Sequence, residues 1–327
     1  MRPARSSKSG IAEKAAKWCF GGAVLAALVV ALTVAGPDHV LKAQGVTPAE
    51  AAQVDVLQSV GMPVEAQVAS ADLLGLSGRL RVVMETPDAL LQNPMLKPLL
   101  AGGEPEKAVT SWPKMTTPDG EAFTVVPLVP FESAKDSGFS GYRVGMWPAM
   151  PTPNPRYTPP SGFIGVTPEN QGTYVSTSFK MQDFLTHDQG NVWPKVLVLR
   201  PALLDKLELL SQELEHEGLS GKLHVMSGFR TPQYNAQGVG EGGRATHSRH
   251  MYGDAADVFV DADGNGMMDD LNKDGKVTVA DALVLRSAAE KVEAQYPSLV
   301  GGLAAYPANS AHGPFVHVDA RGFKARW

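Results

Sequence analysis

Apolar and polar positions follow different patterns in different parts of the chain. Trp18 to Ala35 is a continuous run of uncharged, mostly apolar residues. Residues 78–170 hold short β-rich runs between turn residues, such as Leu80–Met84 and Phe123–Leu128. From Leu199 to His216 the leucines are spaced close to a helical stripe, which predicts a helix. The pattern therefore predicts an apolar segment, then a β-rich part, then a part that contains helices.

The C-terminal part mixes helices with strands. Strands are predicted at Leu223–Met226, Asp254–Val260 and Phe315–Asp319, and a second helix at Ala280–Gln295. These elements do not alternate in a regular βαβ repeat, and no internal repeat is visible. This order of elements favours an α+β fold.

The N-terminal segment predicts where the protein resides. Residues 1–17 carry five basic residues against Glu13 alone, and the eighteen uncharged residues 18–35 are near the minimum for a membrane-spanning helix. The basic flank should stay in the cytoplasm, which places the remainder outside it, in the periplasm. Thr33–Ala35 could instead be a signal-peptidase site, so that the protein would be secreted after cleavage. We favour an uncleaved inner-membrane anchor, because the basic segment and the apolar run are both long.

The exported part divides into three stretches by composition. Residues 36–77 are expected to form a membrane-proximal linker. Residues 78–170 are expected to form a small β-rich spacer domain, in which no cluster of chemically reactive side chains is visible. Residues 179–327 are expected to form the functional domain.

Composition excludes several kinds of protein. The net charge is −5 and no basic stripe with interleaved aromatic residues occurs, so we expect no nucleic-acid partner. Cys19 is the single cysteine. An intrachain disulfide is therefore impossible, and so is a zinc site made of several thiolates.

One segment could supply metal ligands of another kind. His250 and Asp257 could both point at one ion if the chain turns at Gly253 and continues as a strand. Zinc favours nitrogen and oxygen ligands in a tetrahedron, with one corner open in catalytic sites. His317, in the middle of an apolar strand, is the best candidate for a third ligand. A single histidine in an apolar strand is more often a core residue than a metal ligand, and the spacing from His250 to Asp257 would also occur by chance.

Three motifs occur in order along the C-terminal third. They are Ser227–Pro232 (SGFRTP), Ser248–Asp257 (SRHMYGDAAD) and Gly301–Asp319, which contains two glycines, Tyr306-Pro307 and FVHVD. With them, residues 223–327 resemble the zinc peptidases of the M15 family, which includes D-alanyl-D-alanine carboxypeptidases and murein endopeptidases. The similarity is greatest to its exported, murein-endopeptidase-like branch.

The resemblance implies a fold, a metal and a substrate. It implies a small antiparallel-sheet peptidase domain with flanking helices, Zn²⁺ bound by His250, Asp257 and His317, and peptidoglycan as the substrate. It also implies that Arg230 contacts the substrate carbonyl or a nearby carboxylate. A guanidinium can stabilise the oxyanion that forms as water attacks, although a structural salt bridge is the alternative role.

The general base is not settled by the resemblance. Many members of the family have a glutamate three residues before the last zinc histidine, where this chain has Pro314. The branch that the chain resembles also lacks that glutamate. His312 and Asp319 are the candidates for the base, and we rank His312 first. Asp319 could instead orient the imidazole of His317.

An acidic insertion at residues 261–281 follows the second zinc ligand. It resembles a dockerin-type EF-hand loop, because a twelve-residue calcium loop places ligands at positions 1, 3, 5, 7, 9 and 12 and glycine at position 6. Gly275 takes the glycine position, and the ligands would be Asp270, Asn272, Asp274, the Lys276 carbonyl, Thr278 and Asp281. A second, partial Ca²⁺ loop could start at Asp261, with further ligands at Asp263, Asn265 and Asp269.

Two functions follow from these features. The first is an exported zinc metallopeptidase that hydrolyses peptide bonds of peptidoglycan, as an endopeptidase or a carboxypeptidase. The second is a catalytically inactive cell-wall-binding module that keeps the fold and the metal.

Overall fold

A computed structural model describes residues 74–92, 112, 114–116, 122–131, 139, 141–240 and 243–327, all within one compact unit, Pro63–Trp327. The basic segment 1–17, the predicted span 18–35 and most of the linker 36–77 lie outside the described residues. Among the helices of the described part, none combines the length and apolarity that crossing a bilayer requires.

The C-terminal part is built on a five-stranded sheet with the strand order β11-β9-β10-β8-β7. Neighbouring strands run antiparallel, except that β11 runs parallel to β9. The three predicted strands are present as β7, β8 and β10, whereas β9 and β11 were not predicted from the sequence. The strands are β7 (Leu223–Ser227), β8 (Ala255–Val260), β9 (Gly302–Tyr306), β10 (Phe315–Asp319) and β11 (Ala325–Arg326).

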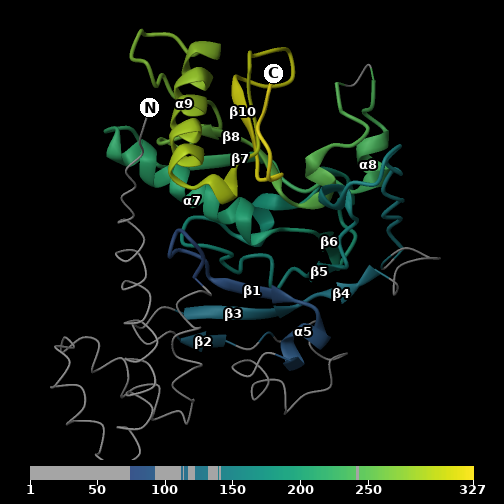
Figure 1. Ribbon diagram of the computed structural model, residues 1–327. Coiled ribbons are helices and arrows are strands. Elements are labelled where there is room, and N and C mark those ends of the chain that lie inside the picture. The colour runs from purple at the N-terminus through teal and green to yellow at the C-terminus, as the bar shows by residue number, and fades with distance from the viewer. Residues whose placement is uncertain are drawn as a thin grey trace, which may run out of the picture. The chain divides into compact units, whose positions relative to one another are not determined.

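Two long helices support this sheet. Helix α7 (Pro201–His216) and helix α9 (Val279–Gln295) contact each other, and α9 packs against β8, β9 and β10 (Figure 1). Both begin and end within two residues of their predicted bounds. Thr278 caps α9 by accepting a hydrogen bond from the amide of Ala280, which is why the helix begins there. The observed mixture of helices and small sheets is the predicted α+β class.

Short elements connect this framework. Helix α8 (Pro232–Ala236) follows β7. The 3-10 turns are η3 (Pro155–Tyr157), η4 (Met181–Phe184), η5 (His187–Gln189), η6 (Arg249–Tyr252) and η7 (Pro297–Leu299).

The N-terminal described part contains short strands, as its sequence pattern predicts, and also a short helix that the pattern did not predict. One sheet has the order β1-β3-β2 and another the order β4-β5-β6. Hydrogen bonds join this part to α7, where Asp205 accepts from Ser77 and Glu208 accepts from Ser178. The elements are β1 (Val82–Glu85), α5 (Pro87–Gln92), β2 (Lys114–Thr116), β3 (Ala122–Pro127), β4 (Val129–Pro130), β5 (Gly162–Val166) and β6 (Lys195–Leu197).

Helix α7 is buried on its polar side as well as on its leucine stripe. Lys206 is 0% exposed. Its ammonium group donates to Glu293 of α9 at 2.6 Å and to the main-chain carbonyl of Asp319 at 2.6 Å. A buried ammonium is tolerated only when it is paired in this way. Lys206 therefore ties both helices to the end of β10.

Candidate metal centre and cleft

His250 and Asp257 are positioned by the turn that the sequence predicted. His250 lies in η6, and Gly253 ends this turn with a φ of +71°. A Cβ at Gly253 would lie 2.6 Å from the main-chain carbonyl of Val198, so both the conformation and the close approach require glycine. The chain then enters β8, which carries Asp257.

His317 is placed beside Asp257 by strand pairing. The two residues are direct cross-strand partners in the antiparallel pair β8–β10. Opposed residues in such a pair project from the same face of the sheet. The sequence identified both residues as candidates, and the pairing of β8 with β10 explains why they lie together.

The three side chains meet at metal-binding distances. His250 Nε2 lies 3.3 Å from His317 Nδ1 and 3.2 Å from Asp257 Oδ1, and His317 Nδ1 lies 3.0 Å from Asp257 Oδ1. Zinc–ligand bonds of about 2.05 Å in a tetrahedron separate the ligand atoms by about 3.3 Å. The residues therefore fit a zinc ion, and all three are buried.

Hydrogen bonds on the far side of each ring fix which nitrogen faces the site. His250 Nδ1 donates to the carbonyl of Gly228 at 2.6 Å, which leaves Nε2 free to bind a metal. A Cβ at Gly228 would lie 2.5 Å from Phe184, so glycine allows this carbonyl to come close. His317 Nε2 donates to Asp319 at 3.0 Å, which leaves Nδ1 facing the other two ligands.

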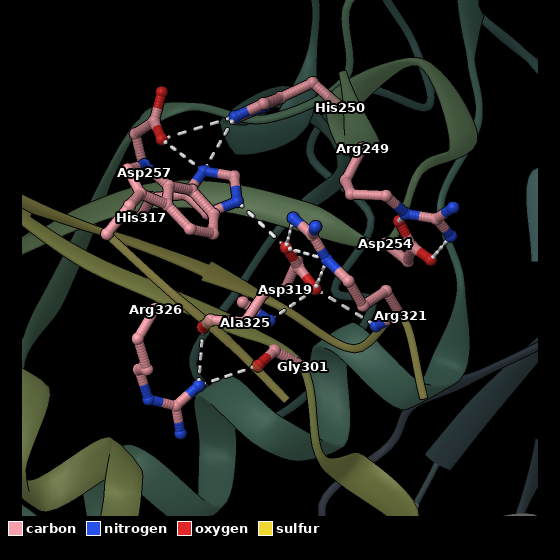
Figure 2. A network of polar contacts seen from close by, with 12 residues as sticks. Arg249, His250, Asp254, Asp257, Gly301, His317, Asp319, Arg321, Ala325 and Arg326 are labelled. Atoms are coloured by element: carbon pink, nitrogen blue, oxygen red, sulfur yellow. Dashed lines mark hydrogen bonds and ion pairs between the residues drawn. The ribbon is translucent and has the colours of Figure 1, made fainter. Parts of the chain in front are cut away.

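Asp319 lies behind His317, away from the other two ligands, and is 0% exposed (Figure 2). Its carboxylate also accepts from the amide of Gly302 at 2.8 Å and from the guanidinium of Arg321. A Cβ at Gly302 would lie 2.4 Å from this carboxylate. The structure therefore surrounds Asp319 with donors, in the position of the orienting partner that the sequence offered as its alternative role.

Arg230 contacts the second oxygen of Asp257. Its Nη2 lies 2.6 Å from Asp257 Oδ2, while Oδ1 faces the histidines. Its Nε donates to the hydroxyl of Ser227. Burial lowers the pKa of Arg230, and the negative charge of Asp257 partly opposes that effect.

The protonation of the ligands follows from burial and mutual contact. Burial lowers the pKa of His250. For Asp257, burial acts to raise the pKa, but His250 and His317 outweigh it and hold the pKa well below the ordinary range. For His317, burial acts to lower the pKa, but hydrogen bonds to Asp257 and Asp319 raise it to about 8. Near neutral pH the metal-free site therefore holds His317 as an imidazolium, with a proton on each ring nitrogen, beside a neutral His250 and an ionised Asp257.

The ligands open into a cleft of about 1250 Å³. His312 lines this cleft. Its Nδ1 donates to the carbonyl of Gly313 at 2.8 Å. Its Nε2 accepts a hydrogen bond from the side-chain Nδ2 of Asn309 at 2.8 Å. The structure thus places His312 in the same cleft as the metal ligands, with Nε2 as an acceptor.

Sequence reasoning missed several residues of the cleft. Tyr234, Arg244, Tyr306 and Trp327 all line it. The Trp327 indole lies 5.4 Å from the His317 ring, between ring centroids, and donates to the hydroxyl of Tyr306. Tyr306 stands in the third motif, but no role was assigned to it there. No motif marked the other three residues, because they reach the cleft through the strand order and the segment after β7.

The acidic insertion forms two successive loops with different carboxylate arrangements. The carboxylates of Asp261, Asp263 and Asp269 lie within 4.8 Å of one another. In the loop that the sequence favoured, Asp270 accepts from the amide of Gly275. Asp281 instead caps α9 by accepting from the amide of Thr278, and it also accepts from the amides of Leu271 and Asn272.

The remaining predicted calcium ligands lie along the same loop. Asn272 accepts from the amide of Asp274, and Asp274 accepts from the amide of Lys276. Thr278 is the N-cap residue of α9. Among the described residues, the acidic cluster close enough to hold a metal is therefore the one in the earlier loop.

Comparison with known proteins identifies a family. A family model described as peptidoglycan L,D-endopeptidase MepK, of the M15 peptidases, matches residues 164–327. The match covers half of the chain and contains the three candidate metal ligands, Arg230 and His312. Neither a comparison with curated proteins nor one with solved structures gave a match.

Proposed function

The chain belongs to the M15 peptidase family of the peptidoglycan L,D-endopeptidase MepK, and on that premise we propose that it is a zinc-dependent endopeptidase of peptidoglycan cross-links. The observation that carries the proposal is the ligand geometry. His250 Nε2, Asp257 Oδ1 and His317 Nδ1 lie 3.0 to 3.3 Å apart in a buried set that opens into the cleft. Two histidines and one carboxylate are a ligand set typical of catalytic zinc.

The side chains around this set have complementary tasks. A zinc ion held there would act as a Lewis acid and lower the pKa of a water molecule at its open position. Arg230, 2.6 Å from Asp257, would stabilise negative charge that develops on the substrate carbonyl. His312 Nε2 accepts from the Asn309 side chain in the free protein, and it would exchange that donor for the attacking water and take its proton. Asp319 would hold the ring of His317 in the tautomer that presents Nδ1.

Digestion of purified sacculi by the full chain tests this proposal. We expect new muropeptides with zinc, none after treatment with a chelator, and recovery when zinc is restored. His250→Ala should abolish cleavage, and His312→Gln should lower kcat without weakening zinc binding. His224→Gln, an exposed histidine on β7, is the matched control and should leave both unchanged.

The same assay separates the alternative function. If the zinc-loaded chain sediments with sacculi but releases no muropeptides, it is a cell-wall-binding module and the peptidase proposal is wrong. If His250→Ala cleaves as the unchanged chain does, the ligand assignment is wrong.

We further propose that the chain acts in the periplasm, held at the inner membrane by residues 18–35. The support is the basic segment 1–17 before an uncharged apolar run, together with a substrate that lies outside the cytoplasm. Fractionation of cells that produce the tagged chain tests this, with alkaline extraction to separate an integral anchor from a secreted form. Recovery in the cytoplasmic fraction would contradict it.

We also propose that the insertion 261–281 binds Ca²⁺ and serves a structural purpose. The clustered carboxylates of Asp261, Asp263 and Asp269 support an ion in the earlier loop, and the spacing from Asp270 to Asp281 supports one in the later loop. Calcium titration of the Asp261→Ala and Asp270→Ala variants assigns each site. No heat of binding in the unchanged chain would refute the proposal.

A further inference from the structure

The cleft is rich in positive charge. Four arginines line it, Arg230, Arg244, Arg249 and Arg321, and Asp257 is the one carboxylate among the described lining residues. Since zinc would add further positive charge, the cleft is suited to an anionic substrate.

Three of these arginines already have carboxylate partners. Arg230 pairs with Asp257, Arg249 with Asp254 and Arg321 with Asp319. Within the described part of the chain, Arg244 has no carboxylate partner. Among the arginines that line the cleft, it is therefore the one whose charge no carboxylate of the described residues balances.

Arg244 is held in place by neutral contacts. Its guanidinium lies 4.1 Å from the centroid of the Tyr234 ring, and Nη1 donates to the carbonyl of Tyr234. Its amide donates to the carbonyl of Gly238 at 2.9 Å. A guanidinium stacked on a ring keeps its in-plane donors available, so Nε and Nη2 can still bind a ligand.

The strand order gives the cleft two different sides. Asp257 and His317 lie on the adjacent strands β8 and β10. Beyond β8, the segment after β7 carries Arg244, whereas beyond β10 the strand β9 and the residue after β11 carry Tyr306 and Trp327. Asp257 and His317 thus lie between the segment that carries Arg244 and the elements that carry Tyr306 and Trp327.

We propose that Arg244, stacked on Tyr234, forms a subsite for a free carboxylate that the peptide substrate bears next to the scissile bond. This inference rests on the proposed peptidase function and deepens it. The carboxylate enters on the β7 side of the metal ligands, and the rest of the peptide lies toward Tyr306 and Trp327. The substrate is thereby bound in one direction.

Two stem-peptide dimers test the subsite. They are synthetic and identical, except that the carboxyl group beside the scissile nitrogen is free in one and a carboxamide in the other. We expect the full chain to favour the free carboxylate by roughly 10- to 100-fold in kcat/KM, the range of a charge-assisted hydrogen bond. Arg244→Gln should lower hydrolysis of the carboxylate dimer by that factor and leave the carboxamide dimer unchanged. Arg286→Gln, on α9 and outside the cleft lining, is the control and should keep the preference.

Each outcome supports or contradicts the proposed carboxylate subsite. Equal hydrolysis of the two dimers by the unchanged chain, or an equal loss on both in Arg244→Gln, would show that Arg244 only packs against Tyr234. Calorimetric binding of both dimers to chelator-treated protein separates this from failure of the peptidase function. If neither dimer is hydrolysed but Arg244→Gln abolishes a carboxylate preference in binding, the subsite stands and the peptidase function is wrong.

Discussion

Replacing Asp319 with asparagine tests how the metal site is oriented. The substitution keeps the size of the side chain but turns one acceptor oxygen into an NH2 group. One carboxylate oxygen accepts from His317 Nε2 at 3.0 Å, and the other accepts from the amide of Gly302 at 2.8 Å. If the asparagine oxygen stays with Gly302, its NH2 group faces His317 Nε2. That ring then favours the tautomer with a proton on Nδ1, the atom that faces Asp257.

The size of the effect follows from this change of tautomer. Loss of an outer partner of a metal-binding histidine costs roughly 10- to 100-fold in metal affinity, or about 1.4 to 2.7 kcal/mol. Arg321 also loses a charged partner, so the free energy of unfolding should fall by about 1 to 3 kcal/mol. The two effects can be measured separately.

A competitive zinc titration measures the affinity and urea denaturation measures the stability. Asp254→Asn is the matched control, because Asp254 is equally buried and pairs with Arg249 but contacts no ligand ring. We expect both variants to lose stability and only Asp319→Asn to lose zinc affinity. Unchanged zinc affinity in a folded Asp319→Asn variant would refute the orienting role.

Three further outcomes are expected. Zinc affinity of the metal-depleted chain should fall about tenfold per pH unit as the pH drops below about 8. The reason is that the pKa of His317 is raised to about 8 and its proton must leave before a metal binds. A flat profile in zinc titrations would contradict this. Lys206→Met should cost about 3 kcal/mol in urea denaturation, since it leaves a buried Glu293 oxygen without its ammonium partner, whereas Lys291→Met at an exposed pair should cost much less; equal losses would show that burial of the pair is unimportant. Gly253→Ala should lower the melting temperature and the zinc affinity together, because φ at Gly253 is +71° and a Cβ would lie 2.6 Å from the main-chain carbonyl of Val198. Unchanged melting temperature and zinc affinity in this variant would disprove the close approach.

The sequence predicted elements well where one local signal dominates. The leucine spacing predicted α7, and the apolar runs predicted β8 and β10. It did not predict that α7 is also buried on its polar side, because Lys206 is paired with Glu293, which is 87 positions away. Such pairing is a property of the tertiary structure and leaves no periodic signal.

The candidate site was predictable in its ligands but not in its surroundings. His250 and Asp257 lie in one short segment, and motif order indicated His317. The place of Asp319 behind that ring could be offered only as an alternative. Arg244 gave no signal at all, because only the tertiary structure shows that no carboxylate of the described residues pairs with it.

The cross-strand pairing of Asp257 with His317 has a consequence for how this domain can vary. Side chains alternate between the two faces of a sheet, so a shift of one residue between β8 and β10 would send one ligand into the core. The chain between Val260 and Phe315 holds the acidic insertion, a helix and a further strand, and its length does not affect that alignment. Insertions there can be gained or lost over evolution, whereas a single added residue within either strand would separate Asp257 from His317 and abolish the metal site.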